Sequence, residues 1–211
     1  MHTRAQTLAT ILATTALLLA IGSATATASR SFSVVGGGRA ILAIAAGERA
    51  VTFTAAGVNF IQDITLHGSL HSLIAKTPGS LVGVINRVST GANCRSSAGV
   101  VCSSSALAPS WHVQLVAFSG TLPRITSITF DLKETAFLLR VENTECLYRG
   151  DVRAITRMSG EPPTTNQLEV DTTRQLALSR VLREEFFRPC AREGIFRGVF
   201  ALSTSVAVRL H

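Results

Sequence analysis

The clearest pattern in the chain is an alternation of apolar and polar residues that recurs through residues 111–150. Turn-forming pairs such as Ser119-Gly120 and Lys133-Glu134 separate the alternating runs. A period of two residues is typical of strands with one buried face, and the short spacing favours antiparallel neighbours. The runs that we predict to be strands are Trp111–Phe118, Ile125–Leu132, Ala136–Val141 and Cys146–Arg149.

Similar patterns lie on both sides of this stretch. Short alternating or apolar runs predict further strands at residues 31–35, 40–46, 51–55, 80–88 and 167–171, and two strands within residues 194–210 that meet near Ser203. Residues 89–110 are rich in Ser, Gly and Ala and predict an exposed loop. We therefore expect an all-β fold, either an antiparallel β-sandwich or a barrel-like single domain.

One segment departs from the strand pattern. Leu178, Leu182 and Phe186 would share one face of a helix, and Pro189 would end it. The segment lies between two predicted strands, so the prediction leaves room for one short helix near residues 172–188.

The first 28 residues have the layout of a secretory signal peptide. Arg4 precedes an apolar run from Leu8 to Ile21, and small residues follow up to Ala28. The run is diluted by Ala and Thr and is shorter than the roughly 20 apolar residues that cross a bilayer, which favours cleavage over a retained anchor. We expect residues 1–28 to be removed and residues 29–211 to form a single secreted β-domain, located outside the cell.

The formal net charge of the chain is +7 at pH 7. Positive charge favours long-range contact with anionic polymers outside the cell, although it serves solubility equally well. The partner is therefore open at this point, with an anionic extracellular polymer or another surface protein as the classes that the charge would suit. We expect no nucleic-acid partner and no membrane span once the signal peptide is cleaved.

Four cysteines are present, and in an oxidising compartment an even number favours two disulfides. Three connectivities are open. We favour Cys94 with Cys102 and Cys146 with Cys190, because the first two flank a short polar loop that can close locally. A zinc site is the alternative, but no CxxC pair or Cys-His cluster supports it.

The segment Asp63 to His71 is the one constellation that suggests a metal site. Asp63, His67 and His71 fall on the polar face of an alternating run. In a helix the two histidines would lie one turn apart, but in a strand they would be separated by about 13 Å, which is too far for one ion unless Gly68 bends the chain. We expect no metal site, with a shared ion on these three residues as the less favoured alternative.

Other catalytic chemistry has little support in the sequence. No G-x-S-x-G pentad is present, and no pair of carboxylates stands out as a glycosidase pair. A Ser-His-Asp arrangement needs no fixed motif, so His67, His71 or His112 with Asp63 or Asp131 stays open as an alternative. Trp111, the single tryptophan, is expected in the core. We expect no catalytic residue and no cofactor.

Three phrases carry a resemblance to known proteins: LHGSLHSLIAKTPGSLVGVINR, WHVQLVAFSGTLPRIT and ECLYRG. They resemble segments of a group of exported, β-rich proteins of high-GC Gram-positive bacteria, for which no function is known. The resemblance covers the chain from about Ala50 onward. It implies an all-β secreted domain, and it implies no catalytic residue.

The function that we expect follows from these observations. The signal peptide, the strand pattern and the lack of a convergent acid, base and nucleophile favour an exported, non-catalytic β-domain with a binding or structural role at the cell surface or in the medium. The alternative is a small secreted hydrolase or metal-binding protein that uses His67, His71 or His112.

Overall fold

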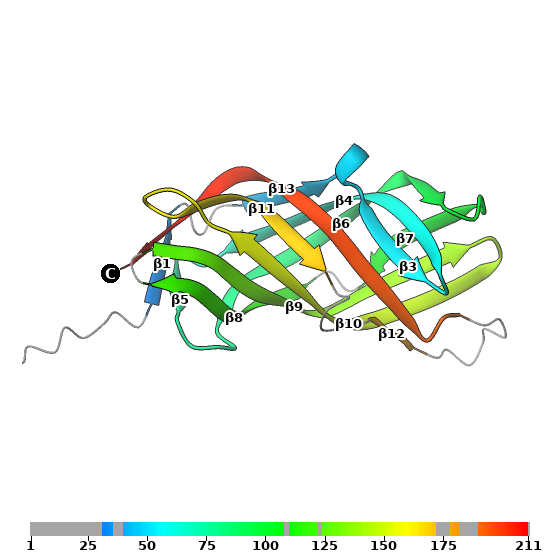
Figure 1. The fold of residues 1–211 in the computed structure, drawn as a ribbon. Coiled ribbons are helices and arrows are strands. Elements are labelled where there is room, and N and C mark those ends of the chain that lie inside the picture. Colours follow the sequence, from blue (N-terminus) through cyan, green and yellow to red (C-terminus); the bar gives the residue numbers. More distant parts are fainter. Residues whose placement is uncertain are drawn as a thin grey trace, which may run out of the picture.

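The fold is built on long strands that run along the molecule (Figure 1). In the computed structural model, which describes residues 31–35, 40–107, 110–121, 124–171, 178–181 and 190–210, every strand belongs to one thirteen-stranded sheet. The five long strands are β4 (Val58–Leu70), β6 (Leu81–Ser96), β9 (Arg124–Val141), β10 (Thr144–Arg157) and β13 (Glu193–Leu210).

Eight shorter strands fill the spaces between the long ones. In several places two short strands follow one another along the same long strand. β2 and β3 each pair with both β4 and β13, and β11 and β12 each pair with both β10 and β13. β7 and β8 each pair with β9. A single 3-10 turn, η1 (Gly47–Arg49), connects β2 to β3. The short strands are β1 (Ser31–Val35), β2 (Ala40–Ala45), β3 (Val51–Ala55), β5 (Leu73–Ala75), β7 (Cys102–Leu107), β8 (Trp111–Thr121), β11 (Thr164–Asp171) and β12 (Leu178–Val181).

The sheet closes on itself. Successive antiparallel pairings lead from β13 through β2, β4, β6, β8, β9, β10 and β11 and back to β13. A closed sheet has an inside and an outside, so alternate residues of each strand point to one or the other. The all-β, antiparallel prediction is confirmed, and of its two forms the pairing follows the barrel-like one.

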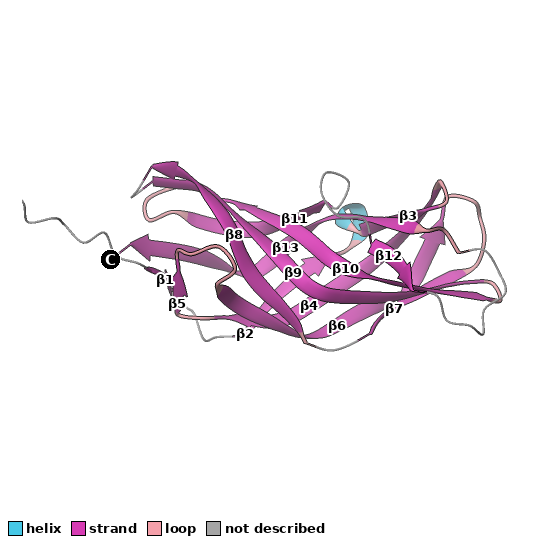
Figure 2. Cartoon of the chain, turned by 90° about the horizontal axis from the view of Figure 1, so that it is seen from below, coloured by secondary structure: helices cyan, strands magenta, loops and turns pink. Residues whose placement is uncertain are grey.

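The two ends of the molecule differ in the strands that form them. β1 and β5 lie at one end beside the last residues of β13, while β3, β7 and β12 lie toward the other (Figure 2). β1 pairs with both β13 and β5, so the short β5 is joined to the sheet through β1. Several strands alternate in burial; in β3, for example, Val51, Phe53 and Ala55 are buried and the threonines between them are half-buried.

Several strand boundaries predicted from the sequence are wrong, because strands continue through local irregularities. The predicted strands Ile125–Leu132 and Ala136–Val141 form the single strand β9, in which Glu134 has a φ of 58°. A residue in the left-handed region can turn the strand locally without ending it, as in a bulge. β10 likewise continues past Arg149, with a register shift between Gly150 and Val152, and the predicted break near Ser203 lies within β13.

Two further predictions need correction. Residues 89–110 are not one loop: β6 continues to Ser96, and residues 102–107 form β7. The helix predicted near residues 172–188 is contradicted at its centre, where Leu178–Val181 is the strand β12, which pairs with β10 and β13. Backbone pairing on both sides outweighs a helical side-chain period. The rest of that segment lies outside the described residues, as does the predicted signal peptide.

Candidate functional site

The interior contains a cavity of about 110 Å³ at the end that β1 and β5 cover. Val34 of β1 and Ile74 of β5 form part of its wall, and residues of β2, β4, β6, β8, β9, β10, β11 and β13 form the rest. Because the lining comes from strands all around the closed sheet, the cavity lies inside the barrel-like fold.

The wall of this cavity is almost entirely aliphatic. Among the described residues, its side chains are mainly Val, Ile and Leu, with Phe130 as the one aromatic residue and no charged side chain in the lining. A cavity of this size has room for water, but water needs two or more polar partners to stay in an apolar site. The chemistry of the wall therefore favours an uncharged, mostly hydrocarbon occupant.

Three polar side chains, those of Ser69, Thr156 and Thr165, belong to the lining. Thr165 Oγ1 donates to the Gln167 carbonyl at 3.0 Å and accepts from the Gln167 amide at 3.2 Å, so both of its roles are used within one strand. Thr156 Oγ1 donates to the Ile128 carbonyl at 3.4 Å and lies 3.9 Å from Met158 Sδ. Both contacts of Thr156 are long compared with an ordinary hydroxyl hydrogen bond.

β1 and β5 form the cover at this end of the cavity. The Val34 amide donates to the Ser72 carbonyl at 2.8 Å, and the Phe32 ring meets the edge of Phe118 with centroids 5.1 Å apart. Lys76 Nζ lies 5.2 Å from the centre of the Phe32 ring. Backbone pairing, an aromatic contact and a cation–π contact together hold β1 over the cavity.

The opposite end of the interior is packed with aromatic rings. Phe137 lies between Trp111 and Phe196, with ring centroids 5.1 and 4.9 Å away, and Phe53 lies 4.8 Å from Tyr148. The void that remains among the side chains here is about 20 Å³. We call this region, lined by residues of β3, β7 and the adjoining parts of the long strands, the aromatic half, and the region around the larger cavity the cavity half.

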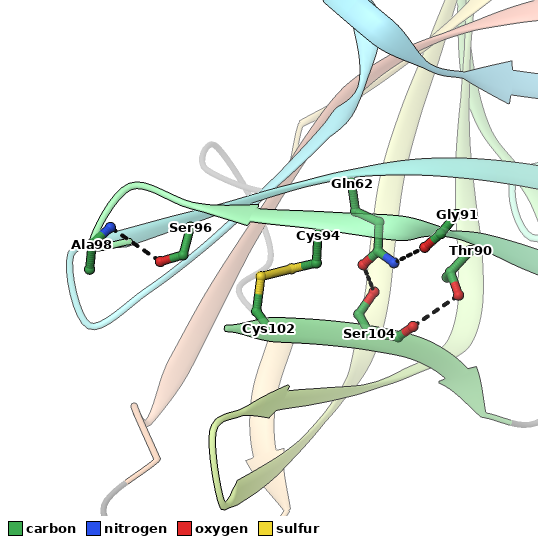
Figure 3. Close-up of a disulfide and its surroundings, with 8 residues drawn as sticks. All are labelled: Gln62, Thr90, Gly91, Cys94, Ser96, Ala98, Cys102 and Ser104. Atoms are coloured by element: carbon green, nitrogen blue, oxygen red, sulfur yellow. Dashed lines mark hydrogen bonds between the residues drawn. A yellow bond between two sulfur atoms is a disulfide. The ribbon is translucent and has the colours of Figure 1, made fainter. Parts of the chain in front are cut away.

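The aromatic half also contains a seam between β6 and β7. No backbone ladder joins the described residues of these two strands; the Cys94–Cys102 disulfide and side-chain hydrogen bonds connect them (Figure 3). Gln62 Nε2 donates to the Gly91 carbonyl at 2.6 Å, and the Gln62 Oε1 accepts from the Ser104 hydroxyl. The buried Gln62 amide thus uses both of its polar ends to close the seam.

The three residues of the suggested metal site lie along one strand and are not brought together. Asp63 Oδ1 accepts from the Gly47 amide at 3.0 Å. His67, on the same face of β4, has Arg87 Nη2 3.3 Å from both of its ring nitrogens. His71 is exposed, just beyond the end of β4. Among the described residues, no group of three or more His, Cys, Asp or Glu side chains is placed to hold a metal ion.

The remaining candidate residues also lie outside the cavity. His112 is exposed on β8, in register with Lys133. Asp131 on β9 is buried beneath two cations: Arg153 Nε is 2.7 Å from its Oδ1, and Lys133 Nζ is 3.6 Å from its Oδ2. Asp131 therefore has a structural role in the outer face of the sheet, and no histidine is among its partners in the described residues.

Both predicted disulfides are confirmed, with sequence separations of 8 and 44 residues for Cys94–Cys102 and Cys146–Cys190. Trp111 is in the core, with 2% of its surface exposed. Its indole N–H has no hydrogen-bond partner within the described part of the chain, so its ring contributes by packing.

The cavity is not among the features that the sequence predicts. Alternation along the strands shows which residues point inward, but it does not show how far each side chain reaches. A signal was present in the placement of the rings: along β13, Phe196 and Phe200 come first and the later inward residues are Leu202, Val206 and Val208.

Comparisons with family models, with curated proteins and with solved structures found no match to this chain. Within the described residues, no helix has the length and apolar character needed to span a membrane.

Proposed function

We propose that this chain is an exported, non-catalytic β-domain that binds a small, uncharged and mostly apolar molecule inside its cavity half. The observation that carries the proposal is the cavity of about 110 Å³ with an aliphatic wall. Close-packed interiors have few voids larger than a water molecule, so a cavity of this size in one half of a core calls for an explanation.

The size of the cavity limits the size of the ligand. An engineered cavity of about 150 Å³ lined by apolar side chains stays dry and binds benzene or xenon. A cavity three-quarters as large suits a molecule of about five or six non-hydrogen atoms. For so small a ligand we expect a dissociation constant of about 0.1–1 mM, because there is little apolar surface to bury.

The non-catalytic part of the proposal rests on the residues around the cavity. Among the described residues of its lining there is no carboxylate, histidine or thiol, so a bound molecule would meet no general acid, general base or strong nucleophile from them. The exported part rests on the N-terminal sequence and on the two disulfides, which persist in oxidising compartments.

The test is direct titration of the disulfide-bonded protein with benzene and with cyclopentane, followed by calorimetry. Ala43 lines the cavity, so an Ala43→Leu variant fills part of it and should weaken binding at least tenfold. The matched control is Cys94→Ser with Cys102→Ser, which lowers stability in the other half and should leave the dissociation constant within twofold of the original. Unchanged binding by Ala43→Leu, or no binding of either hydrocarbon by the folded protein, would rule out the proposal.

A further inference from the structure

The polar group that distinguishes the cavity wall is the hydroxyl of Thr156. Its residue is 5% exposed, and it lines the cavity from β10, opposite Ile128 of β9. A hydroxyl offers one hydrogen to donate and two lone pairs that accept. The question is which of these capacities the protein itself uses.

The protein uses only the donor, and weakly. The hydrogen is directed to the Ile128 carbonyl at 3.4 Å or to Met158 Sδ at 3.9 Å. No donor among the described residues is directed to the lone pairs of Thr156 Oγ1. Thr165 Oγ1 already accepts from the Gln167 amide and keeps one lone pair, and Ser69 is only half-buried. Among the described residues of the wall, Thr156 is therefore the buried hydroxyl with both lone pairs unused.

We propose that the cavity ligand is a small neutral alcohol whose O–H donates to Thr156 Oγ1, an inference that rests on the proposed function. The unused capacity at Thr156 is an acceptor, so the ligand must bring a donor. In the described part of the lining, which holds no charged side chain, a protonated amine would bury its charge without a counterion and a carboxylate would lack a cation. A hydrocarbon body of about five carbons then fills the aliphatic space.

The probes that test this inference are cyclopentanol, methylcyclopentane and cyclopentanone. The first two have the same shape and differ by a hydroxyl in place of a methyl, while the third can accept a hydrogen bond but cannot donate one. The variant is Thr156→Val, which removes the hydroxyl and keeps the volume. Thr165→Val is the matched control, because that hydroxyl lies in the same wall but already accepts one hydrogen bond, from the Gln167 amide, and donates a second one, to the Gln167 carbonyl.

We expect Thr156→Val to weaken cyclopentanol binding about tenfold, since a buried donor would lose its partner. Methylcyclopentane should bind within twofold of the original or more tightly, and the Thr165→Val variant should keep the original ratio of the two affinities. Cyclopentanone should bind the unmodified protein more weakly than cyclopentanol does, because it offers no donor.

The outcomes distinguish this inference from the proposal that the cavity binds a small apolar molecule. If methylcyclopentane binds but Thr156→Val leaves the alcohol-to-hydrocarbon ratio unchanged, the role of Thr156 is overturned and the cavity proposal stands. If no probe binds the folded protein, both are overturned. Should Thr156→Val fail to fold, Thr156→Ser keeps the hydroxyl and must keep the preference for cyclopentanol. Nuclear Overhauser contacts from cyclopentanol to the Thr156 methyl must then appear in the unmodified protein, and their absence would overturn the inference.

Discussion

The two halves of the interior share the same long strands but are filled differently. In the aromatic half, rings from several strands meet near the axis and leave a void of about 20 Å³, whereas the cavity half leaves about 110 Å³. An aromatic ring reaches farther across a closed sheet than Val or Leu does. The comparison teaches that the sheet sets the size of the interior, and that side-chain length decides whether the interior is filled.

The two halves also differ in how they are cross-linked. Cys94 is in register with Gln62, and Cys146 is in register with Leu139, and both Gln62 and Leu139 line the small void. No disulfide joins residues of the cavity wall in the described structure. We infer that the aromatic half is the stable part of the fold and that the cavity half keeps the freedom to admit a ligand.

The largest expected effect is the loss of the Cys146–Cys190 disulfide. Its sequence separation is 44 residues, against 8 for Cys94–Cys102. On the loop-entropy model, replacing both cysteines by serine should lower the free energy of unfolding by about 4 kcal/mol for the long closure and about 2.5 kcal/mol for the short one. Urea unfolding of the two double variants measures the two losses of unfolding free energy. Equal losses would contradict the loop-entropy explanation.

A matched pair of leucines on β9 tests the packing difference itself. Leu139 lines the small void and Leu132 lines the large cavity, with 4% and 3% of their surfaces exposed. We expect Leu139→Ala to lower the free energy of unfolding by about 4 kcal/mol and Leu132→Ala by about 2.5 kcal/mol. A side chain that faces empty space has fewer contacts to lose. Equilibrium unfolding in urea decides the order, and a larger loss at Leu132 would mean that the cavity is closed in solution.

Part of this organisation was predictable from the sequence, and the rest depends on tertiary contacts. The all-β fold follows from the alternating pattern, and the Cys94–Cys102 pairing follows from the short spacing. The continuity of β9 does not, because Lys133-Glu134 has turn composition and the bulge is held by contacts distant in sequence, such as the Asp151 carboxylate, which accepts from the Glu134 amide at 3.1 Å. The candidate site was missed for a related reason: inward direction is a local property, whereas unfilled volume depends on every strand at once.

Enlarging a buried valine should raise the free energy of unfolding where the core is unfilled and lower it where the core is filled. Val82 lines the cavity and Val152 lines neither void, and each is 1% exposed. We expect Val82→Ile to raise the free energy of unfolding by about 0.8 kcal/mol, and Val152→Ile to lower it by about 1 kcal/mol through overpacking. Thermal unfolding should give a higher Tm for the first and a lower Tm for the second. Destabilisation of both to the same degree would argue against an unfilled cavity.

The smallest expected effect concerns Lys133, beside the bulge that separates Leu132 of the cavity half from Phe137 of the aromatic half. Its Nζ lies 2.5 Å from Asp151 Oδ2, and this hydrogen bond, with the nearby charge of Asp131, raises the pKa of Lys133 above its ordinary value. A raised pKa in the folded state means that the stabilisation is complete below the unfolded value of about 10.4 and is lost as the pH rises through the folded value.

Lys133→Met should therefore lower the free energy of unfolding by less than about 1 kcal/mol at neutral pH, since the ion pair is partly exposed. The difference in free energy of unfolding between the original protein and Lys133→Met should stay constant from pH 7 to about 10. Above that pH the difference should become smaller. The control is Arg157→Met, which removes an exposed pair with Glu169 at 3.7 Å. The loss of unfolding free energy that Arg157→Met causes should be small and should not follow the pH dependence of the Lys133→Met loss. If the loss of unfolding free energy caused by Lys133→Met became larger above about pH 10, the ammonium of Lys133 would not support the bulge between the two halves.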